Sequence, residues 1–581
     1  MNYKKIRLIA ACTLLTLAIT TVTGCNSSQT SDSESQSSGN VTTATTTGLA
    51  NVSVSRLDRS EMFTSRDKEI GFEESDSVSV TFSEDKISCN EDFVTINDQT
   101  VTITQEGTYV FSGNLKDGQI RVDAADAKIQ LVLDNVSITN RSSAAIYIAS
   151  ANKVFITLTD NSQNSFSATE EFIPVGETNV DGVIFSKSDL VLNGNGSLTL
   201  SSAKGHGIVS KDDLKITSGT YQITASNHAI CGKDSVRIGD GVFTLNADKD
   251  AIHSENTDDS EKGFLYIENG SFTCNSTGDC FDASGIMQIE NGKFELTSSE
   301  AKAFKADMAL FISDGNFRAN TKDDSFHSNG DLEVSAGTFE ITTEDDAFHS
   351  ESDLVINDGS ICIKECYEGI EGQTITVNNG TIQLTSDDDG FNAAEAYLVI
   401  NGGIVTVDSG GDGLDSNEIL AVNGGEIYIS GPTNSGNGAL DSGTELTISG
   451  GIVVASGASG MAENFGTGST QCAMLVQFDE TTSGTISLKD EDGNELISYE
   501  NTKSFDSVVI STPEIKTGNT YTVTAGNCSE TVEMTETIYG QSRGMGGHGG
   551  MGKPDGMKKP DGMEKPDGME KPDDMKKPDR L

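Results

Sequence analysis

The sequence has no Trp and only 8 Pro, and its 39 basic residues are outnumbered by 89 acidic residues. A net charge of −50 excludes nucleic acid as the expected partner, because a polyanion would be repelled. The lack of Trp argues against a flat aromatic platform for neutral glucan chains, although Tyr266 and Phe311 are expected to face outward and could stack on sugars. The acidic excess is suited to binding divalent cations. A requirement for solubility would explain it equally well.

Long apolar runs are also lacking, except at the N-terminus. Residues 6–22 form an apolar segment that is too short and wrongly flanked for a membrane span. It ends in Val22-Thr23-Gly24-Cys25, which resembles the bacterial lipobox. The resemblance implies a signal peptide over residues 1–24, diacylation of Cys25, and anchoring to the outer face of the bacterial cell membrane through the lipid alone. An ordinary secretory signal is the alternative, and it also implies export.

Segments with few apolar residues flank the main body. Residues 25–75 are rich in Ser and Thr, which predicts a flexible tether. Residues 541–581 repeat Lys-Pro-Asp-Gly-Met with variations, which predicts a disordered tail. The cysteines follow no zinc-binding spacing, and a Cys472–Cys528 disulfide stays open.

The body repeats a unit of about 22 residues, in which apolar residues alternate before a Gly, as in Leu310, Ile312 and Gly315. Alternation of this kind predicts short strands with one buried face. Such a unit cannot bury its apolar face alone, so stacking predicts a parallel β-helix; a propeller blade would need about 40 residues. The glycines suit turns with positive φ and recur at Gly219, Gly241, Gly270, Gly292, Gly315, Gly337, Gly359, Gly380, Gly403, Gly425 and Gly451.

Three parts of this all-β body are distinguished by their regularity. Residues 76–181 are expected to form irregular N-terminal coils or a cap, and residues 182–465 the regular coils. Residues 466–540 break the pattern and are expected to form a small antiparallel β domain that caps the last coil.

In each unit, one strand has a buried residue that is followed by a polar, mostly ionisable residue, and in the stack these residues form a column. It should point outward, and it includes His253, Asp282, Lys305, His327, His349, Glu371, Asn392 and Asp415. The preceding turns are acidic, and stacking places their carboxylates about 5 Å apart. A bridging Ca²⁺ would relieve the repulsion, which predicts metal ligands at Asp250, Asp279, Asp282, Asp323, Asp324, Asp345, Asp346, Asp388, Asp389, Asp412 and Asp415. Two alternatives remain: the Asp residues satisfy turn backbone groups, or the His residues bind a transition metal.

The motif Asp-Asp-x-Phe-His occurs in register at residues 323–327 and 345–349. Together with the lipobox and the repeat length, it resembles the carbohydrate-binding β-helix family of clostridial surface proteins, over about Val78 to Gly540. The resemblance implies a right-handed parallel β-helix, bound calcium and binding of plant polysaccharides, notably polygalacturonate. Its coils are also similar to those of calcium-dependent pectate lyases.

These observations predict a calcium-dependent binding protein for acidic, pectin-like polysaccharide of plant cell walls. The expected glycan contacts are His253, Lys305, His327, His349, Glu371 and Asn392. One alternative is a polysaccharide lyase in which Lys305 acts as the base. A further alternative is a structural adhesin that calcium only stiffens.

Overall fold

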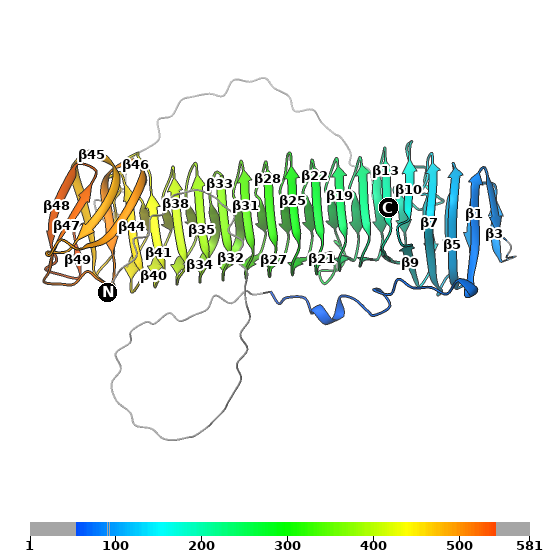
Figure 1. Ribbon diagram of the computed structural model, residues 1–581, viewed down its shortest axis with the longest axis horizontal. Helices are drawn as coiled ribbons and strands as arrows, with labels where there is room; N and C mark the ends of the chain where they lie inside the picture. Colours follow the sequence, from blue (N-terminus) through cyan, green and yellow to red (C-terminus); the bar gives the residue numbers. More distant parts are fainter. Residues whose placement is uncertain (1–53, 90, 92, 542–581) are drawn as a thin grey trace, which may run out of the picture. The chain divides into compact units, whose positions relative to one another are not determined.

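The computed structural model describes residues 54–89, 91 and 93–541. The described chain is almost entirely strand, with two short 3-10 helices, η1 (Arg59–Glu61) and η2 (Glu74–Asp76). Strands stack into a parallel solenoid of about 16 turns, seen along its length in Figure 1. The predicted fold is therefore confirmed. The signal peptide, Cys25 and the tail lie outside the described residues, and no helix within those residues is long and apolar enough to cross a membrane.

Each turn of the solenoid contributes a strand to each of three parallel sheets. The first, sheet A, contains β1 (Ser77–Glu84), β5 (Gly107–Lys116), β7 (Lys128–Asn140), β10 (Gln163–Ala168), β13 (Ser197–Ser202), β16 (Thr220–Ala225), β19 (Val242–Ala247), β22 (Ser271–Ser276), β25 (Lys293–Ser298), β28 (Asn316–Thr321), β31 (Thr338–Thr343), β33 (Ser360–Glu365), β35 (Thr381–Ser386), β38 (Ile404–Ser409), β41 (Glu426–Ser430) and β44 (Ile452–Gly457).

Sheet B carries the ionisable column. It contains β4 (Thr100–Ile103), β6 (Gln119–Asp123), β8 (Ile146–Ser150), β11 (Gly182–Ser186), β14 (His206–Ser210), β17 (Ile230–Gly232), β20 (Ile252–Ser254), β23 (Phe281–Ala283), β26 (Phe304–Ala306), β29 (Phe326–Ser328), β32 (Phe348–Ile356), β34 (Ile370–Val377), β36 (Phe391–Ala393), β39 (Leu414–Ser416) and β42 (Leu440–Ser442).

Sheet C closes the coil, and β7, β32 and β34 run on into it. Its other strands are β9 (Lys153–Leu158), β12 (Asp189–Gly194), β15 (Asp213–Ile216), β18 (Ser235–Ile238), β21 (Phe264–Ile267), β24 (Ile286–Ile289), β27 (Ala309–Ile312), β30 (Asp331–Val334), β37 (Tyr397–Ile400), β40 (Ile419–Val422) and β43 (Glu445–Ile448).

Alternation along each strand creates the core. In β28, for example, Phe317 and Ala319 point inward and their neighbours outward. Because successive coils are in register, inward Phe residues of sheet A stack with centroids 4.7 to 4.9 Å apart. All the glycines of the predicted column have positive φ, as expected. At Gly315 a Cβ would lie 2.8 Å from the ring of Phe317, so the turn excludes any side chain.

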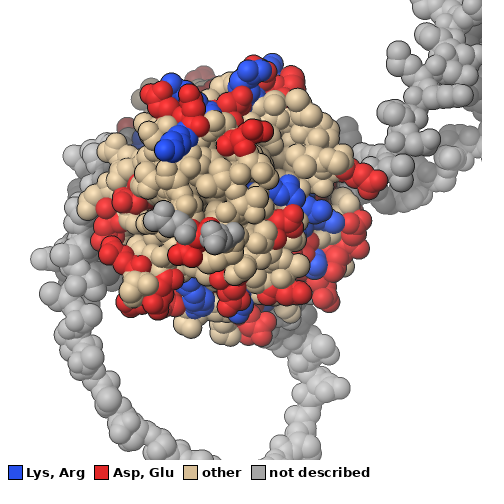
Figure 2. Space-filling view, turned by 90° about the vertical axis from the view of Figure 1, so that its right-hand side faces the viewer, with Lys and Arg blue, Asp and Glu red and all other residues tan. Residues whose placement is uncertain are grey.

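Antiparallel strands cover both ends of the stack. At the N-terminal end, β2 (Lys86–Cys89) pairs with β1, and β3 (Val94–Asn97) pairs with β4. Figure 2 views this end, where uncharged surface occupies the middle and acidic side chains lie around the rim. At the other end are β45 (Ala473–Lys489), β46 (Glu495–Ser511), β47 (Thr520–Ala525), β48 (Cys528–Glu533) and β49 (Ile538–Tyr539). Cys472 and Cys528 are free cysteines, so that disulfide is not formed.

Residues 54–76 form a strap along sheet C, drawn in blue in Figure 1. Arg56 donates to Ser313 and Ser335 at 3.1 and 3.0 Å. Asp67 is fully buried and pairs with Lys215 at 3.2 Å. The expectation of a flexible tether is therefore wrong for residues 54–75, because their charged side chains find partners on distant coils.

The strap also corrects the expectation that aromatic rings on sheet C face solvent. Phe63 lies 6.2 Å from Tyr266, and the Arg56 guanidinium lies 4.8 Å above the Phe311 ring. As a result Tyr266 and Phe311 are only 2% and 0% exposed. Neither ring is available to stack on a sugar.

Candidate functional site

Two side chains per coil face outward along the edge of sheet B. One stands in the turn before the strand, and the other is the middle residue of the three-residue strand, whose two neighbours point inward. We call the two columns together the ladder. The turn column contains His206, His228, Asp250, Asp279, Lys302, Asp324, Asp346, Glu368, Asp389 and Asp412. The strand column contains His253, Asp282, Lys305, His327, His349, Glu371, Asn392, Asp415 and Asp441 in register.

The turn Asp residues are anchored by backbone N–H groups of the next coil. Asp250 accepts the Asp279 N–H at 2.9 Å, and Asp279 accepts the Lys302 N–H at 2.9 Å. Asp389 accepts the Asp412 N–H at 2.6 Å. Satisfying turn backbone groups thus accounts for one oxygen of each of these Asp carboxylates. The second oxygen of residues such as Asp250 faces the strand column and is the one that meets cationic groups.

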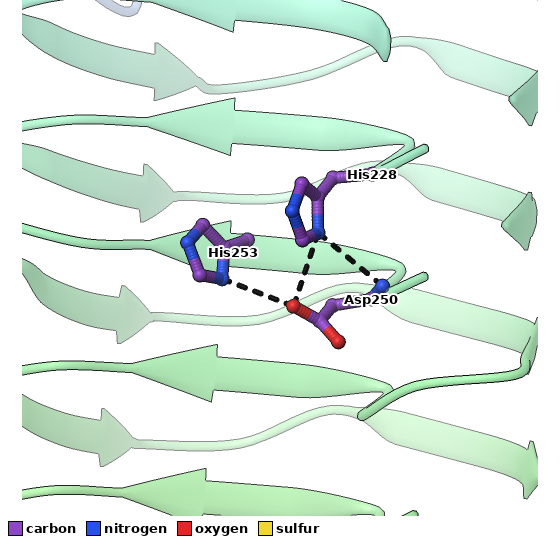
Figure 3. A group of neighbouring side chains, drawn as sticks. All are labelled: His228, Asp250 and His253. Atoms are coloured by element: carbon purple, nitrogen blue, oxygen red, sulfur yellow. Dashed lines mark hydrogen bonds and ion pairs between the residues drawn. The ribbon is translucent and has the colours of Figure 1, made fainter. Parts of the chain in front are cut away.

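In the N-terminal half of the ladder, imidazole and ammonium groups accompany the acids. Asp250 Oδ2 lies 3.0 Å from His228 Nδ1 and 3.1 Å from His253 Nδ1 (Figure 3). Although burial opposes ionisation, the two neighbouring imidazole rings hold the pKa of Asp250 well below its usual range. Burial likewise opposes the charge on His253, but Asp250 and Asp282 raise its pKa to about 10. This half is therefore internally neutralised.

The two coils that carry the Asp-Asp-x-Phe-His motif also pair their carboxylates with cationic groups. His327 Nδ1 lies 2.8 Å from Asp324, and Lys302 Nζ lies 2.9 Å from the same carboxylate. Burial disfavours the charge of Asp324, but His327 and Lys302 lower its pKa to about 2. Asp323 and Asp345 adjoin Asp324 on its solvent side, with one oxygen of each within 4.8 Å. The pKa of Asp345 is raised by burial of its carboxyl group and by the neighbouring Asp346.

Beyond this motif the ladder holds carboxylates and Asn392 but no cationic group. His349 is its last cationic group, 3.1 Å from Asp346 and 3.3 Å from Glu371. Burial and the neighbouring Asp346 raise the pKa of Glu371 to about 8. Asn392 donates to Glu368 at 3.0 Å.

We call the last group of carboxylates the acidic end: Asp388, Asp389, Asp412, Asp415, Asp441 and Glu463. Oxygens of Asp412, Asp415 and Asp441 lie within 4.8 Å of one another. None of the six makes an ion pair with another described residue. Burial first, and then neighbouring carboxylates, raise the pKa values of Asp412, Asp415 and Glu463 to about 7. The acidic end is the part of the ladder that lacks a counter-charge.

The surroundings of Lys305 oppose a role as a base. Its ammonium group lies 3.0 Å from Asp282 and 3.5 Å from Asp307. Burial disfavours the charge, but Asp282 and Asp307 outweigh it and raise the pKa of Lys305. A base must lose its proton to act. Lys305 is held in its protonated form and neutralises its neighbours.

The predicted glycan contacts differ in accessibility. His327 is 8% exposed and has both ring nitrogens occupied, by Asp324 and Asn329. The side chains of Lys305, His349 and Glu371 are 30%, 22% and 23% exposed. A ligand therefore meets these three more readily than His327.

Four functional residues escaped the sequence-based assignment: the ladder residues His206, His228 and Lys302, and Glu463 of the acidic end. The signal for the first two lay in the register, because His206 and His228 each precede an inward Ile by two residues, as Asp250 does. Glu463 belongs to an irregular loop after β44, and its carboxylate accepts the Ser442 N–H at 3.2 Å. No periodic pattern points to it.

The fold and the site together define the class of protein: a parallel β-solenoid with one continuous ionisable edge. The model of the family described as "Carbohydrate-binding domain-containing protein" matches residues 97–369 and 344–540. The chain therefore belongs to this carbohydrate-binding family.

Two individual proteins are similar to parts of the chain. A carbohydrate-binding domain-containing protein of Acetivibrio thermocellus is 38% identical over 153 residues, 26% of this chain and 54% of the relative. The match thus spans about half the length of that curated relative. The solved structure of the polysaccharide lyase-like protein from C. thermocellum, a gadolinium derivative, is 32% identical with a TM-score of 0.36. It covers 44% of this chain and 96% of that chain.

Proposed function

We propose that the protein is an exported surface lipoprotein that binds acidic, pectin-like polysaccharide through calcium held at the acidic end. Membership of a carbohydrate-binding family supports the general class. The observation that carries the finer proposal is the group Asp412, Asp415 and Asp441, whose oxygens lie within 4.8 Å without a cationic partner among the described residues. The lipobox at Cys25 supports the anchor.

The donor set of the acidic end fits Ca²⁺ on its chemistry. Calcium takes six to eight oxygen ligands at about 2.3 to 2.6 Å, so two ligands of one ion lie at most about 5 Å apart. The three oxygens of Asp412, Asp415 and Asp441 meet this limit. In the other half of the ladder, Lys and His neighbours already neutralise carboxylates such as Asp282 and Asp324. We therefore place calcium at the acidic end first.

A bound cation also removes the electrostatic obstacle to an acidic ligand. A chain of net charge −50 repels polyuronate. Calcium with open coordination positions would be ligated by protein and uronate carboxylates together. The ammonium group of Lys305, at 30% exposure, offers a direct contact to a further carboxylate along the same edge.

The test is retention of the chain from Asn26 onward on immobilised polygalacturonate, in calcium and in EDTA. We expect retention in calcium only, and loss of most retention in the double variant Asp412→Asn, Asp415→Asn. The matched control is Glu418→Gln with Glu445→Gln, which removes the same charge from exposed positions just before β40 and at the start of β43. Retention that persists in EDTA, or falls equally in both variants, would overturn the proposal. No retention in either buffer would favour the structural adhesin.

A further inference from the structure

Three histidines of consecutive coils form a stacked row at the N-terminal half of the ladder. The rings of His206 and His228 are 5.1 Å apart at 17°, and those of His228 and His253 are 4.3 Å apart at 16°. The chain has 6 His in total, so half of them meet here. Parallel rings place the Nδ1 edges of His228 and His253 on the same side, toward Asp250 (Figure 3).

Donor atoms converge at this point with the spacing of a metal site. Nδ1 of His228, Oδ2 of Asp250 and Nδ1 of His253 lie within 4.8 Å of one another. The shortest contacts are 3.0 Å from His228 to Asp250, and 2.9 Å from His253 to Asp282. Ligands of a tetrahedral zinc ion at about 2.1 Å are roughly 3.4 Å apart. The observed contacts are about 0.4 to 0.5 Å shorter than this spacing, so a small outward movement of the side chains would make room for an ion.

Hydrogen bonding leaves this cluster incomplete. The Asp250 N–H donates to His228 Nδ1 at 3.3 Å, while Asp250 Oδ2 lies 3.0 Å from the same nitrogen. One nitrogen cannot accept from the first and donate to the second. Nδ1 of His253 is buried and has no hydrogen bond of acceptable geometry within the described part of the chain, despite two carboxylates at 2.9 and 3.1 Å.

We propose that His228, Asp250 and His253 bind a divalent transition metal of the zinc class. The carboxylate of Asp282 lies beside this group, 2.9 Å from His253 Nδ1. Two imidazole nitrogens select such an ion over calcium, which prefers an all-oxygen shell. The four side chains are 12 to 15% exposed, so the site is nearly closed and of the structural kind.

The site extends beyond the proposed function, because it lies at the other end of the ladder and needs no glycan. Its ligands belong to the turns and strands around β17 and β20, so one ion ties two consecutive coils together. The Asp279 N–H holds the Asp250 carboxylate in place at 2.9 Å, a supporting contact of the kind that orients metal ligands.

The test is calorimetric titration of Zn²⁺ into the chain from Asn26 onward, stripped of metal and kept in excess calcium so that all-oxygen sites are filled. His548→Ala is the background, because His548 is the one His outside the described residues. We expect one zinc per chain, and affinity more than about 100-fold weaker in His228→Ala and in His253→Ala. Titration with Co²⁺ should give the visible absorption of a tetrahedral site.

His327→Ala is the matched control, because that ring lies in the same ladder with both nitrogens hydrogen-bonded. It should keep zinc binding. Asp250→Asn keeps the shape of the site and should also lose zinc, with circular dichroism confirming the fold of every variant. Absence of zinc binding would overturn the proposal, as would binding that survives in both His228→Ala and His253→Ala, or that falls equally in His327→Ala.

Discussion

Replacement of Asp415 by Asn should stabilise the C-terminal coils when calcium is absent. The Asp415 carboxylate has oxygens of Asp412 and Asp441 within 4.8 Å. At that distance two like charges cost about 3.5 kcal/mol at an effective dielectric constant of 20. Solvent and salt reduce this for a half-buried group, so we expect a gain of roughly 1 to 2 kcal/mol.

Whether Asp415→Asn raises or lowers the stability of these coils depends on pH and on calcium. Burial and the neighbouring Asp441 raise the pKa of Asp415 to about 7, above its value of about 3.9 in an unfolded chain. Between these values the folded chain binds more protons, so stability that is present below pH ~4 is lost as the pH rises through about 7. Asp415→Asn should therefore stabilise at pH 8 in EDTA and have little effect at pH 4. In calcium at pH 8 it should destabilise, because a ligand is lost.

Hydrogen exchange of the backbone amides in β39 and β42 is the suitable assay, since it reports the local opening free energy of these coils. Glu418→Gln, an exposed change of equal charge, should leave the exchange unchanged. Faster exchange of Asp415→Asn in EDTA at pH 8, or the same effect at both pH values, would refute the reasoning.

Three further predictions follow from other parts of the chain. The wild type and Lys305→Ala should both release no unsaturated uronides from polygalacturonate, measured by absorbance, because Lys305 is held protonated by Asp282; steady release by the wild type alone would restore the lyase alternative. Asp67→Asn should cost about 2 to 4 kcal/mol, because Lys215 at 7% side-chain exposure loses its counter-charge. Limited proteolysis should then cut within residues 54–76, and unchanged protection would contradict this. Gly315→Ala should cost about 1 to 3 kcal/mol in urea unfolding, since its φ of 142° and the Phe317 ring at 2.8 Å leave no room for a Cβ. Gly71→Ala, with nothing within 4 Å, should be neutral by comparison.

The repeat made the solenoid predictable, because the spacing of residues such as Leu310, Ile312 and Gly315 fixes both the strand faces and the turn in every coil. The strap was not predictable. Its composition is that of a linker, and Arg56 finds Ser313 at a separation of 257 residues. No local pattern reveals a partner so distant.

The ladder could be predicted in part. The strand column followed from the alternation. The two residues that precede it in register are the uncharged Val209 and Cys231, so the adjacent His206 and His228 went unnoticed. The division into a neutralised half and an acidic end also required the structure. It depends on which turn residue faces which strand residue, as with Asp250 and His253.

Retention on polygalacturonate in calcium, compared with retention in EDTA, tests the central claim most directly. The account predicts that the chain from Asn26 onward is held in calcium and released by EDTA, and that Asp412→Asn with Asp415→Asn is not held. Equal retention of the wild type in both buffers would contradict it.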